Sequence, residues 1–194
     1  PAHAGYISPP MLSGAIFGGM FASPSVSDVL AAILAVSLPT SAGGKGTILI
    51  VKNYTGDRLN FGMAAEKAKL EYGIDCRMLV VSDDCAVERN KGITGRRGVA
   101  GTVFVHKVCG ALAHAGRPIA DVFNEGVKIV NNLMSVGVAL NSVTIPGAEA
   151  NERLADPAIA EVGLGIHGEP GSTQVPFTTS KEFAKIMVDK CVSF

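Results

Sequence analysis

The stretch from residue 48 to residue 61 constrains the fold more than any other part of the sequence. It reads Ile-Leu-Ile-Val-Lys-Asn-Tyr-Thr-Gly-Asp-Arg-Leu-Asn-Phe, so an uncharged apolar run ends abruptly in polar residues. Short, β-branched and uncharged runs are typical of strands that are covered on both faces of a parallel sheet. We therefore predict a strand over residues 47–51, followed by a helix that is rich in helix-forming residues.

The polar turn between this strand and this helix is the first candidate site. In open α/β sheets, ligands bind beyond the carboxyl ends of the strands, which is where the turn lies. The residues concerned are Lys52, Asn53, Tyr54, Thr55 and Asp57. An alternative is that Thr55 or Asp57 only caps the helix.

Strands and helices alternate around this stretch. A Ser-x-x-Asp capping pattern at Ser25 predicts a helix that Pro39 prevents from continuing. A second helix is predicted over residues 57–72, with Gly73 as its left-handed cap. A second strand over residues 76–81 ends in the polar run Ser-Asp-Asp, at the same edge as Lys52. The fold class that follows is α/β, with an open, mostly parallel sheet and flanking helices.

The secondary structure of the next segment is ambiguous, and that of the segment after it is predicted clearly. Residues 102–115 are ambiguous, because Val-Phe-Val favours a strand whereas the length and the later alanines favour a buried helix. Pro118 is predicted to open a helix at its first helical position, and an apolar stripe runs on to Leu133.

The alternation of strand and helix patterns ends after about residue 135. A capping box at Thr179 and Glu182 predicts a last helix. We expect one α/β domain over residues 1–135 and the beginning of a second α/β domain over residues 136–194. Three segments of the second region have strand character: residues 138–140, 142–145 and 161–166.

Composition excludes several classes of protein. Seventeen basic and seventeen acidic residues balance to zero, and no basic block is present, so no nucleic-acid partner is expected. No apolar run is long enough to cross a bilayer. The four cysteines are widely spread without metal-ligand spacing, so we expect free thiols, no metal site and a cytoplasmic location.

A second candidate site lies in the glycine-rich segment Gly163–Gly171. The segment contains the spacing Gly-x-Gly-x-x-Gly of dinucleotide sites, but a Glu-Pro-Gly turn follows where that fingerprint needs a helix. What remains is His167. A lone histidine is usually structural, yet Gly165 and Gly168 flank it and would let a small ligand approach the imidazole closely.

Four motifs, in this order and covering nearly the whole chain, resemble the dihydroxyacetone kinase family and its substrate-binding K domain. They are Phe-Ala-Ser-Pro-Ser (Phe21–Ser25), Val-Lys-Asn-Tyr-Thr-Gly-Asp-Arg-Leu-Asn-Phe-Gly (Val51–Gly62), Arg-Arg-Gly-Val-Ala-Gly-Thr (Arg96–Thr102) and Gly-Ile-His-Gly-Glu-Pro-Gly (Gly165–Gly171).

The resemblance implies a role for each candidate residue. It makes His167 the nucleophile that adds to the ketone carbon of dihydroxyacetone and forms a covalent hemiaminal. It makes Asp57 the base or hydrogen-bond acceptor for the hydroxyl that is phosphorylated. Lys52 is a donor that orients the substrate or offsets charge, and Gly168 also binds the substrate. The implied product is dihydroxyacetone phosphate, and glyceraldehyde is a second candidate substrate. The second domain is then DegV-like, and its beginning carries His167.

The resemblance also implies partners. ATP with Mg²⁺ would be bound by a separate L domain, fused downstream or on a partner chain, although a phosphorylated carrier protein is an open alternative as phosphoryl donor. The family pairs its K subunits, so a homodimer is expected. A glycine-rich segment ending Gly-His-Glu precedes the position of Pro1 in family members, so an incomplete pocket, and inactivity of these residues alone, are expected. The rival function is a regulatory paralogue that binds dihydroxyacetone without catalysis.

Overall fold

The structure, a computed structural model, describes residues 2–87, 95–149 and 152–194. These residues form two compact units, and each is described by itself. No helix in the described ranges is long and apolar enough to cross a membrane. The first unit is drawn from Pro1–Asp83 and Arg97–Leu133, and the second from Asp84–Arg96 and Met134–Phe194.

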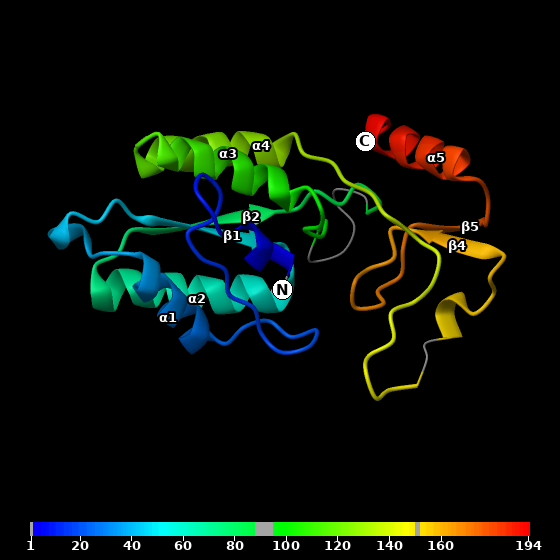
Figure 1. The fold of residues 1–194 in the computed structure, drawn as a ribbon, viewed down its shortest axis with the longest axis horizontal. Coiled ribbons are helices and arrows are strands. Elements are labelled where there is room, and N and C mark those ends of the chain that lie inside the picture. Colours follow the sequence, from blue (N-terminus) through cyan, green and yellow to red (C-terminus); the bar gives the residue numbers. More distant parts are fainter. Residues whose placement is uncertain (1, 88–94, 150–151) are drawn as a thin grey trace. The chain divides into compact units, whose positions relative to one another are not determined.

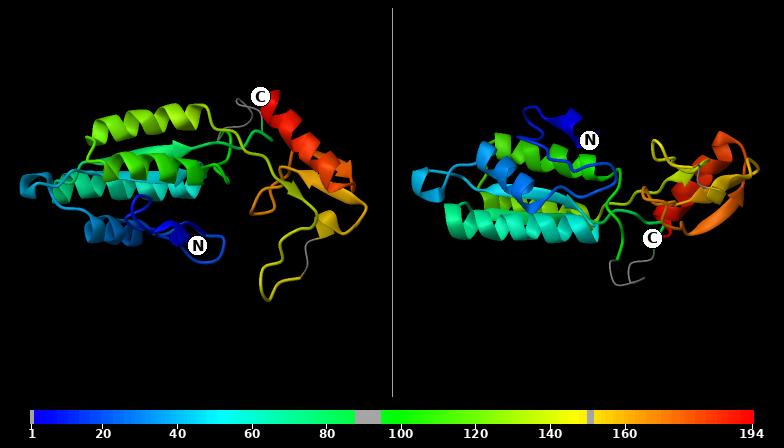
Figure 2. Two further views of the ribbon diagram at one scale, coloured as in Figure 1. Left: turned by 45° about the horizontal axis from the view of Figure 1, so that its top comes forward. Right: turned by 90° about the horizontal axis from the view of Figure 1, so that it is seen from below.

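The first unit is a three-layer α/β structure (Figures 1 and 2). Strands β1 (Thr47–Lys52) and β2 (Cys76–Val81) pair in parallel, with their first residues, Thr47 and Cys76, opposite each other. One face of this pair is covered by α1 and α2, and the other by α3 and α4 (Figure 1). The helices are α1 (Val26–Val36), α2 (Thr55–Tyr72), α3 (Thr102–His114) and α4 (Ile119–Asn131).

Coverage on both faces explains why the strands carry so little charge. Two clusters of buried side chains lie on the two faces of the sheet, one with α1 and α2 and the other with α3 and α4. Val51 of β1 and Val81 of β2 are almost completely buried. The predicted α/β class is therefore confirmed, although the parallel sheet formed by the described residues has two strands and is not a larger open sheet.

The helix ends follow the capping chemistry of the sequence. Ser25 is the N-cap of α1, which starts at Val26, and its Oγ accepts a hydrogen bond from the Asp28 amide at 3.2 Å. Gly73 has a φ of 64° and its N–H reaches carbonyls of the last turn of α2. The ambiguous segment from Thr102 is a helix, with Val105 and Cys109 buried in the core. Pro118 lies one position before α4, as its N-cap.

The second unit is a small antiparallel sheet with one helix. Its strands are β3 (Val138–Ala139), β4 (Ile159–Val162) and β5 (Thr173–Pro176), in the order β3-β4-β5. The short 3-10 turn η3 (Glu152–Leu154) precedes β4. Helix α5 (Ser180–Val192) begins after the predicted capping box at Thr179, and its Phe183 packs edge-to-face on Phe177.

Three expectations for this region are wrong. Residues 142–145 form no strand, because Val143 and Ile145 are about half exposed and pair with no neighbour in the described sheet. The strand predicted over residues 161–166 ends at Val162, because Gly163 turns the chain with a φ of 75°. The described residues contain a small antiparallel sheet and one helix here, so the DegV-like second domain is not in this chain.

Two glycines of the first unit predict opposite effects on stability. A Cβ at Gly98 would lie 2.5 Å from the Val81 carbonyl oxygen and 2.8 Å from Lys52 Cα, so Gly98→Ala should destabilise the protein by about 1–3 kcal/mol. Gly62 lies inside α2 with nothing within 4 Å of such a Cβ, so Gly62→Ala should stabilise it by about 0.5–1 kcal/mol. Urea unfolding of both variants measures the two changes, and equal stabilities would contradict the packing described for Gly98.

Candidate functional site

The carboxyl edge of β1 carries the first group of candidate residues. Lys52 is the last residue of the strand, and the Asn53 amide donates to the end of β2 at 2.9 Å. Tyr54 is the N-cap of α2 and makes no side-chain capping bond, so Thr55 and Asp57 lie inside the first turn of the helix. The capping alternative is therefore wrong. Asp57 lies where the helix dipole favours a carboxylate.

Two other motif segments pack onto this same edge. A Cβ at Gly56 would lie 2.6 Å from Ser23 Oγ, and Asn60 Nδ2 donates to the Pro24 carbonyl at 2.7 Å. Gly98 also packs directly against Lys52, because a Cβ at Gly98 would lie 2.8 Å from Lys52 Cα. The three motifs that contain these residues are far apart in sequence, and the fold brings them together around the Lys52–Asp57 turn.

Asp83, at the end of β2, has a structural role. Its carboxylate is completely buried and accepts hydrogen bonds from the amides of Val99, at 2.7 Å, and Gly101, at 2.8 Å. These two bonds tie the segment after Arg97 to the sheet. The carboxylate therefore holds Gly98 against the candidate site, and it is not a candidate for direct contact with a ligand.

A histidine pair near Lys52 was missed in the sequence. His106, on α3, is buried, and its Nε2 lies 2.9 Å from Nδ1 of His3 on the 3-10 turn η1 (Ala2–Tyr6). Burial, and then the nearby His3 and Lys52, lower the pKa of His106 to about 4. Burial and the charge of Lys52 also lower the pKa of His3. Both rings are therefore neutral at pH 7. A histidine within an otherwise apolar helix segment was the available signal.

The second group of candidate residues lies in the second unit, on the loop after β4. The His167 amide donates to Glu169 Oε2 at 2.9 Å, and the His167 ring nitrogen Nδ1 lies 3.0 Å from Oε1 of the same carboxylate. Gly168 has a φ of 82° and donates to the Gly165 carbonyl at 3.0 Å. The chain turns at Ile166–Gly168 and not at the predicted Glu-Pro-Gly, residues 169–171. No helix follows the glycines, so the dinucleotide fingerprint is accidental.

Glu169 is thus the orienting partner of His167, a role that sequence reasoning did not assign. Partial burial by itself raises the pKa of Glu169, but hydrogen bonds from the His167 ring and backbone outweigh it and hold the carboxyl pKa below its usual value. The carboxylate therefore stays ionised through the neutral range. The spacing His-x-Glu in a glycine-rich turn was the signal that could have identified it.

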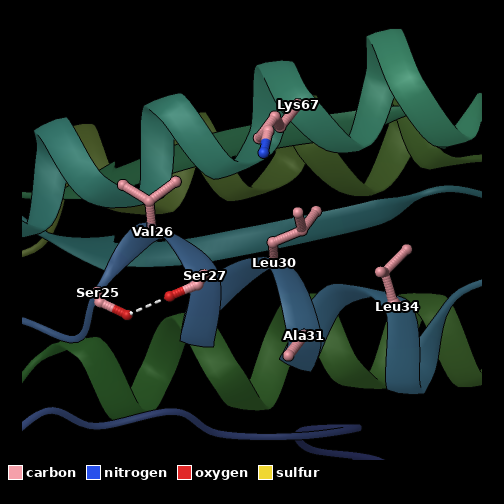
Figure 3. Close-up of a pocket in the computed structure, with 7 residues that line it drawn as sticks. All are labelled: Ser25, Val26, Ser27, Leu30, Ala31, Leu34 and Lys67. Carbon is pink, nitrogen blue, oxygen red and sulfur yellow. Dashed lines mark hydrogen bonds between the residues drawn. The ribbon is translucent and has the colours of Figure 1, made fainter.

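A surface groove between α1 and α2 is a separate feature (Figure 3). Its lining is mainly apolar, from Val26, Leu30, Ala31 and Leu34 of α1, with Lys67 of α2 at its side. None of the candidate residues lines it. Within residues 2–87, 95–149 and 152–194, no three His, Cys, Asp or Glu side chains gather as metal ligands.

These features define a class of protein, an α/β domain with a polar turn at the carboxyl end of its first strand, joined to a unit in which a carboxylate holds a histidine. The chain belongs to the Dak1 domain family, whose model matches residues 1–193.

Curated relatives are kinases by name. The chain is 53% identical over 172 residues to a "Putative 3,4-dihydroxy-2-butanone kinase" of Solanum lycopersicum, which covers 89% of this chain and 28% of the relative. It is 46% identical over 193 residues to "Dihydroxyacetone kinase" of Citrobacter freundii, covering 100% of this chain and 33% of the relative. The chain therefore spans about a third of the length of these relatives.

Solved structures agree with the fold. The dihydroxyacetone kinase of C. freundii matches with a TM-score of 0.90 and 45% identity, over 100% of this chain and 34% of that one. The same enzyme has been solved in complex with AMP-PNP and Mg²⁺. A "Dihydroxyacetone kinase operon co-activator Dha-DhaQ" matches with a TM-score of 0.88 and 33% identity, over 100% of this chain and 57% of that one.

Proposed function

We propose that this chain is the substrate-binding K part of a dihydroxyacetone kinase, which holds dihydroxyacetone for phosphoryl transfer to a terminal hydroxyl. The observation that carries the proposal is the paired contact of Glu169 with the amide and ring of His167. Membership of the Dak1 family and the kinase names of the relatives support it. Lys52, Asp57 and Gly168 complete the proposed site.

The proposed first step is capture of the ketone by His167. With Nδ1 protonated and donating to Glu169, the lone pair for attack is on Nε2. Nε2 bonds to the carbonyl carbon, the electron pair of the C=O π bond moves to oxygen, and that oxygen takes up a proton. The proton that the ring gives up leaves from Nδ1, and the net product is a neutral hemiaminal. Glu169 stabilises the imidazolium through which the reaction passes.

A covalent bond would compensate for the small size of dihydroxyacetone, which limits its non-covalent affinity. Dihydroxyacetone has six non-hydrogen atoms, so even a ceiling of about 1.5 kcal/mol per atom limits its affinity to roughly 9 kcal/mol, near micromolar. Hydrogen bonds alone would also struggle to exclude glycerol. A nucleophile that reacts only with a carbonyl separates ketones and aldehydes from polyols chemically. Glyceraldehyde, which also has a carbonyl, is therefore a second proposed substrate.

Asp57 and Lys52 are proposed to serve the second step. Asp57 accepts the proton of the terminal hydroxyl as its oxygen attacks phosphorus, and the Lys52 ammonium orients the substrate or offsets negative charge. The neutral His3–His106 pair adds no positive charge near Lys52 at pH 7.

We propose ATP with Mg²⁺ as the phosphoryl donor, bound by a separate L domain in cis or in trans. The complex of the C. freundii relative with AMP-PNP and Mg²⁺ supports this donor. A relative from Listeria innocua, 43% identical over 100% of this chain, is named a "PTS-dependent" subunit, which keeps a phosphorylated carrier as the alternative. A homodimer and a cytoplasmic location complete the proposal.

The alternative function is a regulatory protein that binds dihydroxyacetone without phosphorylating it. The similarity to an operon co-activator is the observation that favours it. Such a protein could keep His167, Lys52 and Asp57, so the residues alone do not separate the two functions.

An assay of the full-length protein with its L domain, dihydroxyacetone, ATP and Mg²⁺ tests the proposal. We expect dihydroxyacetone phosphate to form, and glycerol to be left unphosphorylated at the same concentration. Formation of the hemiaminal without any turnover, with ATP or with a phosphorylated carrier, would reject the kinase and support the regulatory alternative.

A further inference from the structure

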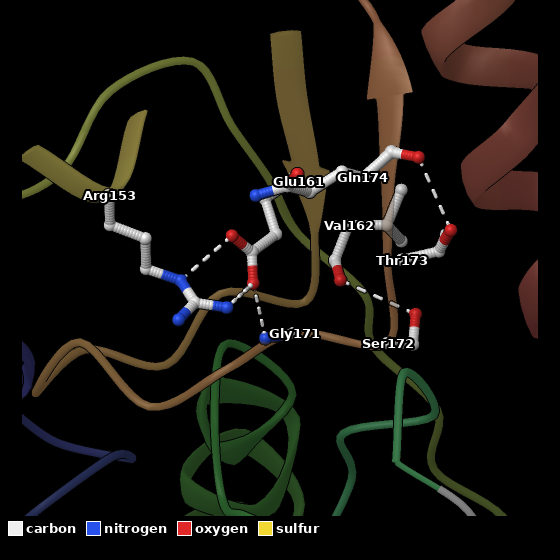
Figure 4. A network of polar contacts seen from close by, with 7 residues as sticks. All are labelled: Arg153, Glu161, Val162, Gly171, Ser172, Thr173 and Gln174. Carbon is white, nitrogen blue, oxygen red and sulfur yellow. Dashed lines mark hydrogen bonds and ion pairs between the residues drawn. The ribbon is translucent and has the colours of Figure 1, made fainter. Parts of the chain in front are cut away.

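A buried carboxylate in β4 lies directly behind the loop that carries His167. Glu161 is 1% exposed, and its side chain points to Arg153 on one side and to the Gly171 backbone on the other (Figure 4). Arg153 Nε donates to Oε2 at 2.9 Å and Arg153 Nη2 donates to Oε1 at 2.8 Å. Burial of a charge is costly without such pairing, so the arrangement needs an explanation.

Stability alone does not supply that explanation. Only the carboxylate of this pair is buried, because Arg153 is exposed, and an ion pair with an exposed partner usually contributes little to stability, so the pair is weak support for a purely structural role. The third bond of the carboxylate is more informative. Gly171 N–H donates to Oε1 at 2.5 Å, which ties the end of the His167 loop to the ion pair (Figure 4).

The backbone at Gly171 lies directly on this carboxylate. A Cβ there would lie 2.3 Å from the Val162 carbonyl oxygen and 3.0 Å from Glu161 Oε1. The next residue, Ser172, donates its amide to the same carbonyl at 2.9 Å, and the loop begins with Gly163 donating to the Gly137 carbonyl at 2.7 Å. Both ends of the loop are therefore fixed to the sheet.

A short path of hydrogen bonds leads from this anchor to the imidazole. The Gly165 amide donates to the Glu169 carbonyl at 2.8 Å, which closes the loop across its middle. The Glu169 carboxylate then holds His167 at its amide and its ring. A shift of Gly171 would therefore move Glu169 and, through it, the ring nitrogen that reacts.

We propose that Glu161, held by Arg153, is a positioning residue that fixes the loop of His167 in the geometry needed to capture a ketone. This inference rests on the proposed function. The expected effect is a weaker capture of the ketone, seen in KM, because reacting groups must be held to within about 1 Å of their productive geometry.

The test uses three variants of the full-length protein: Glu161→Leu, Arg153→Leu and the double variant. Arg153→Leu leaves a buried carboxylate without its cation and should be the least stable. The double variant removes both charges and should regain most of that stability. Neither variant that lacks Glu161 offers an acceptor to Gly171. Asp189→Asn, which breaks the exposed Lys185–Asp189 pair of the same unit, is the matched control.

Two readouts separate positioning from mere folding. In the double variant, the KM for dihydroxyacetone should rise at least about tenfold and the hemiaminal signal should fall to match, with a smaller change in kcat; a loss of folded protein would lower kcat alone. Hydrogen exchange of the amides from Gly165 to Gly171 should accelerate at least about tenfold, while exchange in β4 stays slow. Asp189→Asn should change neither.

The outcomes are distinct. A double variant that regains stability, KM and slow loop exchange together would show that the pair is structural only and would overturn the inference. Absence of the hemiaminal in the wild-type protein would instead reject the proposed function. Loop exchange is measured without substrate, so it decides the anchoring role of Glu161 in that case as well.

Discussion

Replacement of His167 by alanine should abolish covalent capture of dihydroxyacetone. With substrate labelled with carbon-13 at the carbonyl, the wild-type full-length protein should show a new resonance of a saturated carbon bonded to nitrogen and oxygen. His167→Ala should lose this resonance completely, because the proposed attack uses the lone pair of the His167 ring. Discrimination against glycerol should weaken in the same variant, since it depends on the reaction with a carbonyl.

His114 provides the matched control for this experiment. It is an exposed histidine on α3, outside the proposed site, so His114→Ala should retain the full resonance. A resonance that survives in His167→Ala would remove His167 from the mechanism. A resonance lost in both variants would point to damage unrelated to the nucleophile.

Replacement of Asp57 by asparagine should separate capture from transfer. The hemiaminal resonance should persist, because His167 and Glu169 are unchanged. The kcat for phosphorylation should fall by about 10²–10⁴-fold, the range expected when a general base is removed. Asparagine keeps the size and polarity of the side chain but cannot accept a proton at neutral pH. Steady-state kinetics beside the labelled-substrate spectrum measures both effects in one preparation.

The control on the same helix is Glu66→Gln. Glu66 is exposed on α2, and the substitution removes one negative charge, as Asp57→Asn does. Its kcat should remain within about twofold of the wild-type value, in line with the small effect of an exposed charge. A similar fall in both variants would mean that the net charge of the helix matters, and that Asp57 is not a base.

Local chemistry explains which parts of the fold were predictable from the sequence. The capping residues Ser25, Gly73 and Thr179 and the uncharged run of β1 each act within a few residues of themselves, so their patterns define the element boundaries. Residues 142–145 show the limit of this reasoning. Alternating apolar residues indicate a strand only when a partner strand is within reach, and partners come from distant sequence.

The residues of the candidate site also fall into those that the sequence predicts and those that it does not. Lys52, Asp57 and His167 were identified because each follows a predicted strand at a polar or glycine-rich turn and because their motifs resemble one family. Glu169, His106 and Glu161 were not, because what matters is their contact with another side chain or a distant amide. A buried glutamate in a strand looks, in sequence, like an exposed one.

Nucleophile and orienting carboxylate are two residues apart, on one turn. Catalytic groups gathered from remote elements depend on the whole fold for their alignment. Here the proposed reactive centre is instead a contiguous peptide, Ile166–Glu169, whose internal geometry does not depend on the domain that delivers the phosphoryl group. Together with the Glu161–Arg153 pair that anchors its loop, such a centre could be combined with different phosphoryl-donating partners, and a kinase and a sensor could share it.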